Sequence, residues 1–171
     1  MKKRILIIAA VVAAAALSFR ARAEDFEHGE FHFVPKLGYL DPRSQGTKGD
    51  MAYGADVLYE WAVRHGLKLG FTYSRHDVTD QSETARSRIL SFGYRCNLPS
   101  PGEKRGRPYL GADIASHRVT FLGEKYQKMG GTLLGGYEWY GGGVAEISYL
   151  FAGSDEDVRL GGLAVFAGYR F

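Results

Sequence analysis

The sequence predicts an all-β protein, a closed antiparallel up-and-down eight-stranded transmembrane β-barrel. Three observations predict this fold. The first residues have the composition of a secretion signal, the rest of the chain holds no apolar run long enough for a membrane helix, and about eight segments alternate apolar with polar or small residues. A bilayer offers no water to exposed backbone groups, so a membrane protein without helices has to close its strands into a barrel.

Residues 1–23 have the pattern of a cleavable signal peptide. Basic residues at positions 2–4 precede an apolar run over residues 5–19, and the Ala-Arg-Ala sequence that ends at position 23 matches the small-x-small pattern of a cleavage site. The apolar run is shorter than the roughly 20 residues that cross a bilayer, which favours a cleaved signal over a permanent anchor. We therefore expect export to the outer membrane, with the barrel domain at residues 24–171.

The charge of the mature chain argues against a nucleic-acid partner. Five basic residues leave with the signal, so Lys and Arg fall from 22 to 17 against 19 acids. A nucleic-acid-binding domain would carry a basic stripe instead. Cys96 is the only cysteine, so no intramolecular disulfide is expected. Cys96 is predicted to be an inert small hydrophobe on the apolar face.

The alternating segments are long enough to be membrane-spanning strands, because about ten tilted residues cross the hydrocarbon layer. One face of each carries apolar and aromatic residues, and the other carries mostly Gly, Ala, Ser and Thr with one or two charges. Small residues suit the cramped lumen of an eight-stranded barrel, so the apolar face is predicted to point outward. A soluble periplasmic lipocalin-like binding barrel, with apolar residues inward, is the alternative. The predicted strands are 31–41, 50–61, 66–76, 86–97, 107–118, 129–139, 143–152 and 160–171.

An even number of strands places both chain ends in the periplasm and fixes which connections face outside. The predicted outer loops are 42–49, 77–85, 119–128 and 153–159, and the predicted inner turns are 62–65, 98–106 and 140–142. The segment 98–106 is long for an inner turn and contains two prolines, so it is expected to be irregular.

Charged residues on the predicted lumen face are the first candidates for a function. They should pair with one another, because an unpaired charge in a lumen closed by protein costs several kcal/mol. A structural plug is favoured over a gated narrow pore, since a barrel of this size leaves little room for water. The predicted inward charges are Lys36, Asp56, Glu60, Lys68, Arg95, Asp113, His117, Glu138, Glu146 and Arg170.

The strand motifs Gly135-Gly136-Tyr137-Glu138-Trp139 and Ala167-Gly168-Tyr169-Arg170-Phe171 make the chain resemble the small outer-membrane barrels that include OmpX and the transmembrane domain of OmpA. The terminal Phe171, with Tyr169 two residues before it, resembles the signal that the barrel assembly machinery reads. Phe166 stands where that signal usually has glycine. The resemblance implies outer-membrane lipid, lipopolysaccharide and the assembly machinery as partners.

No catalytic, cofactor or metal residue is assigned from the sequence. Ser74 and His76 share a strand face, but in the reverse order of the His-x-Ser motif that lipid A deacylase barrels carry, and Ser116 and His117 point to opposite faces. His28 and His32, with Glu27 and Glu30, could chelate a metal only in a helix, and an irregular tail is favoured there. The acidic run at 155–157 is expected to be a solvated loop tip.

The function predicted from the sequence is that of a non-enzymatic outer-membrane barrel with a packed polar lumen, whose surface loops contact envelope components or other cells. Three alternatives remain open at this stage: a lipid A modifying deacylase or acyltransferase, the soluble binding barrel, and a narrow channel. Fold analogy does not choose among them, because function lives in sites placed on a fold.

Overall fold

The computed structural model describes residues 29–42, 49–77, 84–100, 106–121, 123–152, 154–155, 158–159 and 161–171. The predicted signal peptide and its cleavage site lie outside these residues. The strands are β1 (Glu30–Pro42), β2 (Asp50–Ala62), β3 (His65–Asp77), β4 (Thr84–Asn97), β5 (Gly106–Phe121), β6 (Glu124–Trp139), β7 (Gly143–Ala152), β8 (Ser154–Asp155), β9 (Val158–Arg159) and β10 (Gly162–Tyr169).

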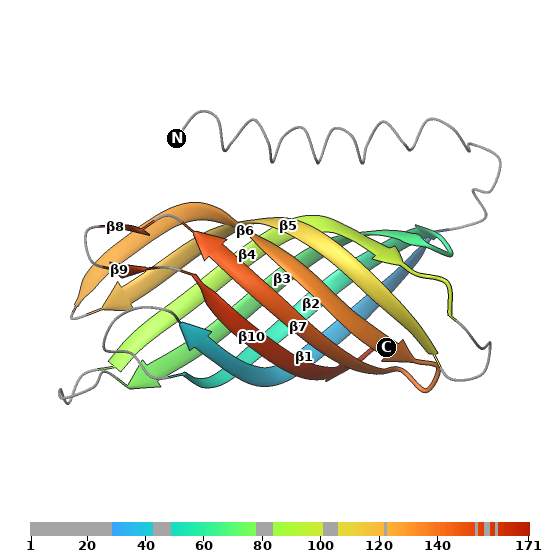
Figure 1. Cartoon of the computed structure of the whole chain (residues 1–171), viewed down its shortest axis with the longest axis horizontal. Coiled ribbons are helices and arrows are strands. Elements are labelled where there is room, and N and C mark those ends of the chain that lie inside the picture. The colour runs from blue at the N-terminus through green and yellow to red at the C-terminus, as the bar shows by residue number, and fades with distance from the viewer. Residues whose placement is uncertain are drawn as a thin grey trace.

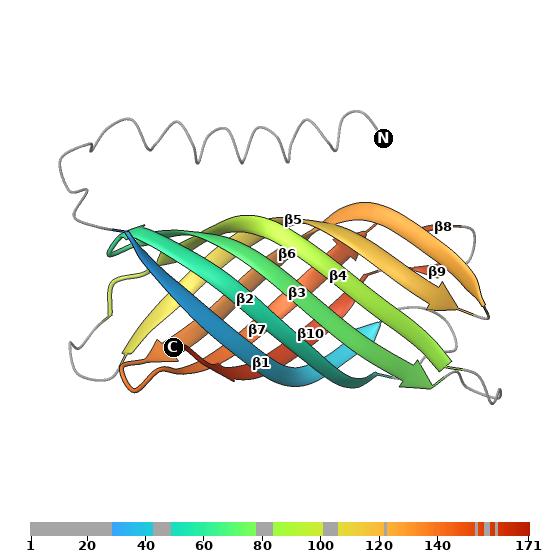
Figure 2. The same cartoon turned by 180° about the vertical axis from the view of Figure 1, so that it is seen from behind.

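The eight long strands form the predicted closed, antiparallel, up-and-down barrel (Figures 1 and 2). Each strand pairs with its neighbour in sequence, and β10 pairs with β1 to close the ring. The C-terminal residue extends this closure, because the Phe171 amide donates to the Phe33 carbonyl at 2.9 Å and the Phe33 amide donates to the Phe171 carbonyl at 3.2 Å. The start of β1 and the C-terminus therefore lie at the same end of the barrel, which we call the inner end (Figure 1). The opposite end is called the outer end.

The apolar face of the strands points outward, as predicted. Phe92 on β4 and Leu133 on β6 are 49% and 55% exposed, whereas Asp56 on β2 and Glu146 on β7 are 6% and 5% exposed inside the barrel. A soluble binding barrel would show the reverse arrangement, with apolar side chains inward. The structure therefore contradicts the soluble alternative. None of the described residues forms a helix that is long and apolar enough to cross a membrane.

The prediction of an outer loop at residues 119–128 is wrong, because most of this segment is strand. β5 continues to Phe121, β6 begins at Glu124, and Gly123 closes the turn with a positive φ of 80°. In the outer part of this hairpin the outward residues Arg118, Thr120, Lys125 and Gln127 are polar, so the apolar outer face that marked the spanning strands is missing there. The predicted loop 153–159 also contains strand, since β8 and β9 form a small separate sheet.

The long inner connection 98–106 is anchored where it leaves the barrel. The Asn97 amide donates to the Arg64 carbonyl and the Leu98 amide donates to the Pro108 carbonyl, both at 2.8 Å. These bonds tie the start of the connection to the β2–β3 turn and to β5. Residues 101–105 lie outside the described part of the chain.

The outward apolar wall predicts a depth-dependent response to charge. Leu69 lies in the middle of β3, between Val57 and Phe92 on the adjacent strands. Leu69→Arg should destabilise the barrel in lipid vesicles by roughly 2–4 kcal/mol, the cost of arginine near the bilayer midplane. Denaturant titration of folding into vesicles measures this. The control is Val63→Arg in the β2–β3 turn, where Val63 is 82% exposed and the expected cost is about 0–1 kcal/mol. Equal costs at the two sites would contradict the assigned membrane face.

Candidate functional site: the charged lumen

Glycines on the inward face make room for the charges of the lumen. A Cβ atom at Gly70 would lie 2.7 Å from the Ser91 hydroxyl and 2.8 Å from a carboxylate oxygen of Asp56. A Cβ atom at Gly93 would collide with Asp113 and the Ala112 carbonyl. Contacts this short do not occur between real atoms, so the small residues of the polar face are what allow long charged side chains to fill the interior.

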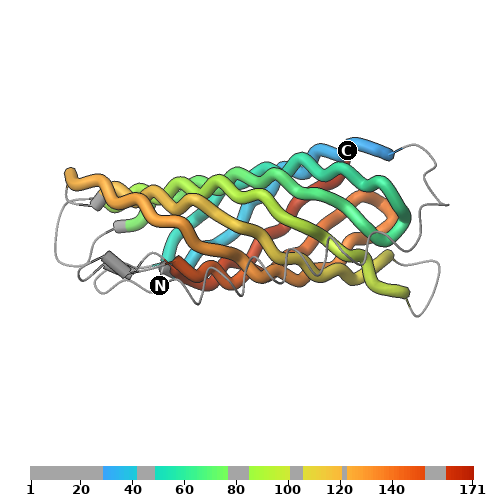
Figure 3. Tube along the Cα trace, turned by 90° about the horizontal axis from the view of Figure 1, so that it is seen from above, coloured from blue at the N-terminus to red at the C-terminus, as the bar shows by residue number. Residues whose placement is uncertain are grey.

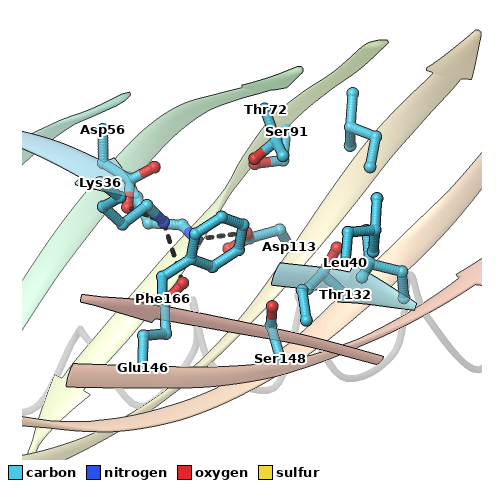
Figure 4. A pocket seen from close by; sticks show the side chains of 14 residues that line it. Lys36, Leu40, Asp56, Thr72, Ser91, Asp113, Thr132, Glu146, Ser148 and Phe166 are labelled. Atoms are coloured by element: carbon cyan, nitrogen blue, oxygen red, sulfur yellow. Dashed lines mark hydrogen bonds and ion pairs between the residues drawn. The ribbon is translucent and has the colours of Figure 1, made fainter. Parts of the chain in front are cut away.

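The middle of the lumen holds two sets of ion pairs. The Lys36 Nζ atom lies 2.7 Å from Asp56 and 2.9 Å from Glu146, and the Tyr109 hydroxyl donates to Glu146 at 3.1 Å. The Lys68 Nζ atom lies 2.7 Å from Asp113. Figure 4 shows Lys36, Asp56, Asp113 and Glu146 converging from different strands of the barrel, with the Phe166 ring beside Lys36. The Lys36 ammonium lies 5.0 Å from the centre of that ring, which adds a cation–π contact.

A second cluster occupies the inner end of the lumen. Arg107 lies 2.8 Å from Glu60 and 3.2 Å from Glu138, and Arg170 lies 2.8 Å from Glu138 and 3.4 Å from Glu60. Arg95 also pairs with Glu138 and stacks over the Tyr109 ring, with its guanidinium carbon 3.7 Å from the ring centre. Arginine suits such a cluster because its planar fork can serve two carboxylates at once.

The space left between these side chains is small. A cavity of about 20 Å³ lies among Lys36, Asp56, Lys68, Asp113 and Glu146, and one of about 10 Å³ lies beside Tyr109. A single water needs roughly 10–15 Å³ of such space. These cavities therefore fit isolated waters and no larger solute. The arrangement is that of a packed polar core.

The ten predicted inward charges all lie on the lumen side, and eight of them are buried. Glu60 and Arg170 are half-buried near the inner mouth. Sequence reasoning missed four members of the network, Arg107, Tyr109, His32 and Asn97. Asn97 accepts a hydrogen bond from Arg95 at 3.1 Å and donates one to Glu60 at 2.8 Å. On each strand the missed residue is an even number of positions from a predicted inward charge, so it lies on the same face, and extending the alternation by a few residues would have found it.

His32 contradicts the prediction of an irregular N-terminal tail at that position. It lies in β1, with its Nε2 atom 3.5 Å from carboxylate oxygens of both Glu30 and Glu60. Pairing with β2 fixes the backbone there as a strand, so a helical His-x₃-His chelate cannot form. His28 and Glu27 lie outside the described residues. Within the described ranges, no cluster of three His, Cys, Asp or Glu side chains is arranged to hold a metal ion.

The outer end of the lumen holds a serine–histidine pair. The Ser74 hydroxyl and the His76 Nε2 atom are 2.7 Å apart, which confirms that the two side chains share a face. Ser74 is 0% exposed and His76 is 2% exposed, so neither meets the lipid side. His117 is also buried inside, while Ser116 faces out and accepts a bond from Gln127 at 3.2 Å. The predicted separation of Ser116 and His117 is thus confirmed.

The remaining sequence candidates lie near the ends of strands. Cys96 is half-buried on the outer side of β4, next to His65 of β3 and Leu110 of β5, where the apolar face was predicted. Asp155 of the acidic run belongs to β8, and residues 156–157 lie outside the described part of the chain.

The geometry defines a fold class, the small closed eight-stranded β-barrel with an apolar outside and a charged lumen, and solved structures of outer-membrane proteins share this fold. No family model and no curated protein sequence matches the chain. Neisserial surface protein A is similar, with a TM-score of 0.58 and 15% identity over 84% of this chain and 98% of its own. OprG from Pseudomonas aeruginosa has a TM-score of 0.56 and 15% identity over 84% of this chain and 97% of its own. Ail, the attachment invasion locus protein of Yersinia pestis, has a TM-score of 0.51 and 18% identity over 85% of this chain and all of its own.

The Lys68–Asp113 pair predicts a test of the lumen. Lys68→Met should lower the free energy of unfolding by roughly 3–5 kcal/mol, because it leaves a buried carboxylate without its partner. The double variant Lys68→Met/Asp113→Leu should recover most of that loss, since replacing both charges by apolar groups is often nearly neutral. Urea unfolding in vesicles measures both. A double variant that is no more stable than the single one would contradict the view of this pair as a mutually compensated plug.

Proposed function

We propose that the protein is an exported, non-enzymatic outer-membrane barrel whose outer end contacts envelope components or other cells. The observation that carries the proposal is the arrangement of the two faces, an apolar outer wall around a lumen filled with paired charges. The wall suits lipid, and the filled lumen leaves the exposed outer end as the part that can meet a partner.

The chain ends support the proposed route to the membrane. Residues 1–23 have the pattern of a signal peptide. Tyr169 and Phe171 are exposed on the outside of the barrel at its inner end, with their ring centres 4.8 Å apart. Their exposure supports the proposal that the barrel assembly machinery reads them as a C-terminal aromatic signal.

The β5–β6 hairpin supports a role in surface contact. Pairing between β6 and β7 stops at Gly130 and Ala152, whereas β6 pairs with β5 from Glu124 onward. The hairpin therefore reaches past the end of β7 (Figure 3). Its outward side chains are polar and linked across the two strands, since Arg118 of β5 donates to Gln127 of β6 at 2.9 Å. Within β6, Tyr126 donates to Glu124 at 2.6 Å. A polar, ordered projection of this kind offers a partner a defined surface.

One observation supports the alternative function, a lipid A modifying enzyme, and another argues against it. A serine and a histidine at hydrogen-bond distance are the minimum for nucleophilic catalysis. The Ser74–His76 pair, however, lies inside the wall, and an acyl chain in the outer leaflet meets only the outside. A channel has equally little support, because the two cavities among the described lumen residues fit isolated waters.

Expression of the full chain in a Gram-negative host tests the proposal. We expect a mature protein beginning at Glu24, recovered in the outer-membrane fraction and migrating differently in detergent gels before and after heating. Phe171→Ala should lower the assembled fraction severalfold. Phe31→Ala, which removes another exposed aromatic ring at the same end of the barrel, is the matched control and should assemble normally. Release of the protein by osmotic shock, or its retention in the inner membrane, would contradict the proposal.

A further inference from the structure

Four arginines form a patch on the outside of the barrel near its outer end. Arg75 on β3, Arg86 and Arg88 on β4 and Arg118 on β5 are all exposed. The strand register sets them side by side, because Arg75 is directly opposite Arg86 and Arg88 is directly opposite Arg118. We call these four residues the arginine patch. β3 and β4 can be followed side by side in Figure 2.

Nothing in the described part of the chain neutralises the arginine patch. The ion pairs among the described residues involve other cations, which lie in the lumen and at its inner mouth. Arg118 donates only to the neutral amide of Gln127, at 2.9 and 3.3 Å. Side chains directly opposite in an antiparallel pair have Cβ atoms about 5 Å apart, and like charges there repel. Two such pairs side by side are unfavourable unless an anion binds between them.

The arginine patch continues the lipid-facing wall. Toward the membrane centre along the same strands, Tyr73 is opposite Arg88, and after it Phe71 is opposite Leu90. Leu90 is opposite Ser116, and Phe92 and Ile114 follow. Phe71, Leu90, Phe92 and Ile114 are exposed apolar side chains of the outer wall. Acyl chains packed against these residues would bring their headgroup to the level of the arginines. A soluble anion would gain nothing from this continuity.

We propose that the arginine patch binds the phosphate groups of an acylated, phosphorylated lipid in the outer leaflet. Arginine donates two parallel N–H bonds to phosphate, and four guanidinium groups match a headgroup that carries more than one phosphate. Binding replaces the repulsion between opposite arginines by charge-assisted hydrogen bonds. This inference rests on the proposed outer-membrane location and adds to it a specific lipid site on the wall of β3, β4 and β5.

The test uses the mature barrel folded in micelles of an uncharged polyoxyethylene detergent and titrated with diphosphoryl lipid A, with binding followed by native mass spectrometry. Arg88→Gln should weaken binding about fivefold, the contribution of one basic residue near an anionic surface. The variant Arg75→Gln/Arg86→Gln/Arg88→Gln/Arg118→Gln should weaken it on the order of a thousandfold, since four such contributions multiply. Arg64→Gln, which removes an exposed arginine at the inner end, is the matched control and should bind as the wild type does.

Several results would overturn the proposal. These are unchanged binding by the quadruple variant, an equal loss in Arg64→Gln, equal binding of lipid A from which the phosphates have been removed, and displacement of lipid A by millimolar inorganic phosphate or by heparin. Displacement by inorganic phosphate would assign the patch to a free phosphate, and displacement by heparin would assign it to a soluble polyanion.

Folding is measured separately. Without anionic lipid, Arg88→Gln should be at least as stable to heat as the wild type, because it removes a repulsion. A lower melting temperature would assign the arginines a structural role and overturn the proposal. A wild-type chain that forms no heat-modifiable barrel contradicts the proposed function, whereas a folded barrel that ignores the lipid phosphates overturns only the lipid site.

Discussion

The closed backbone hydrogen-bond ladder is the constraint on which the rest of this molecule depends. In lipid every unpaired backbone group costs several kcal/mol, so the sheet must have no edge within the bilayer. β10 meets β1 to remove that edge, and the bonds between Phe33 and Phe171 extend the seam to the last residue. Closing only eight strands makes the interior narrow. The narrow interior in turn requires small residues on one face and leaves the other face to lipid.

Inside that narrow wall, charge is tolerated because it is shared. Lys36 serves two carboxylates, and Glu138 receives contacts from three arginines, Arg95, Arg107 and Arg170. Buried ion pairs are weak contributors to stability compared with well-packed apolar groups. These ion pairs favour the observed strand register, because a strand shifted in register would separate several pairs at once. The lumen therefore helps to specify one register while the outer wall supplies the affinity for lipid.

The sequence was sufficient to predict the number of barrel strands, the direction of the two faces and the ten inward charges. Apolar and polar residues alternate along a strand wherever one of its faces meets lipid and the other meets the lumen. The sequence could not predict which charges pair. That depends on the stagger between strands, which places Lys36 of β1 against Glu146 of β7 although the two strands are separated by β10. It also missed the outer part of the β5–β6 hairpin, where the outward side chains are polar and the apolar outer face that marks the other strands is missing. The arginine patch was missed for a related reason, since Arg75 and Arg118 meet Arg86 and Arg88 only across strands.

The central claim is that alternate residues face lipid and lumen. It is tested most directly by spin labels placed one at a time on cysteines at positions 163–167 of β10, in a Cys96→Ser background, with the barrel in lipid vesicles. The account predicts that labels at Leu163, Val165 and Ala167 are accessible to oxygen dissolved in the bilayer and that labels at Ala164 and Phe166, which are 1% and 4% exposed, are not. Uniform accessibility along the strand, or the opposite alternation, would contradict it.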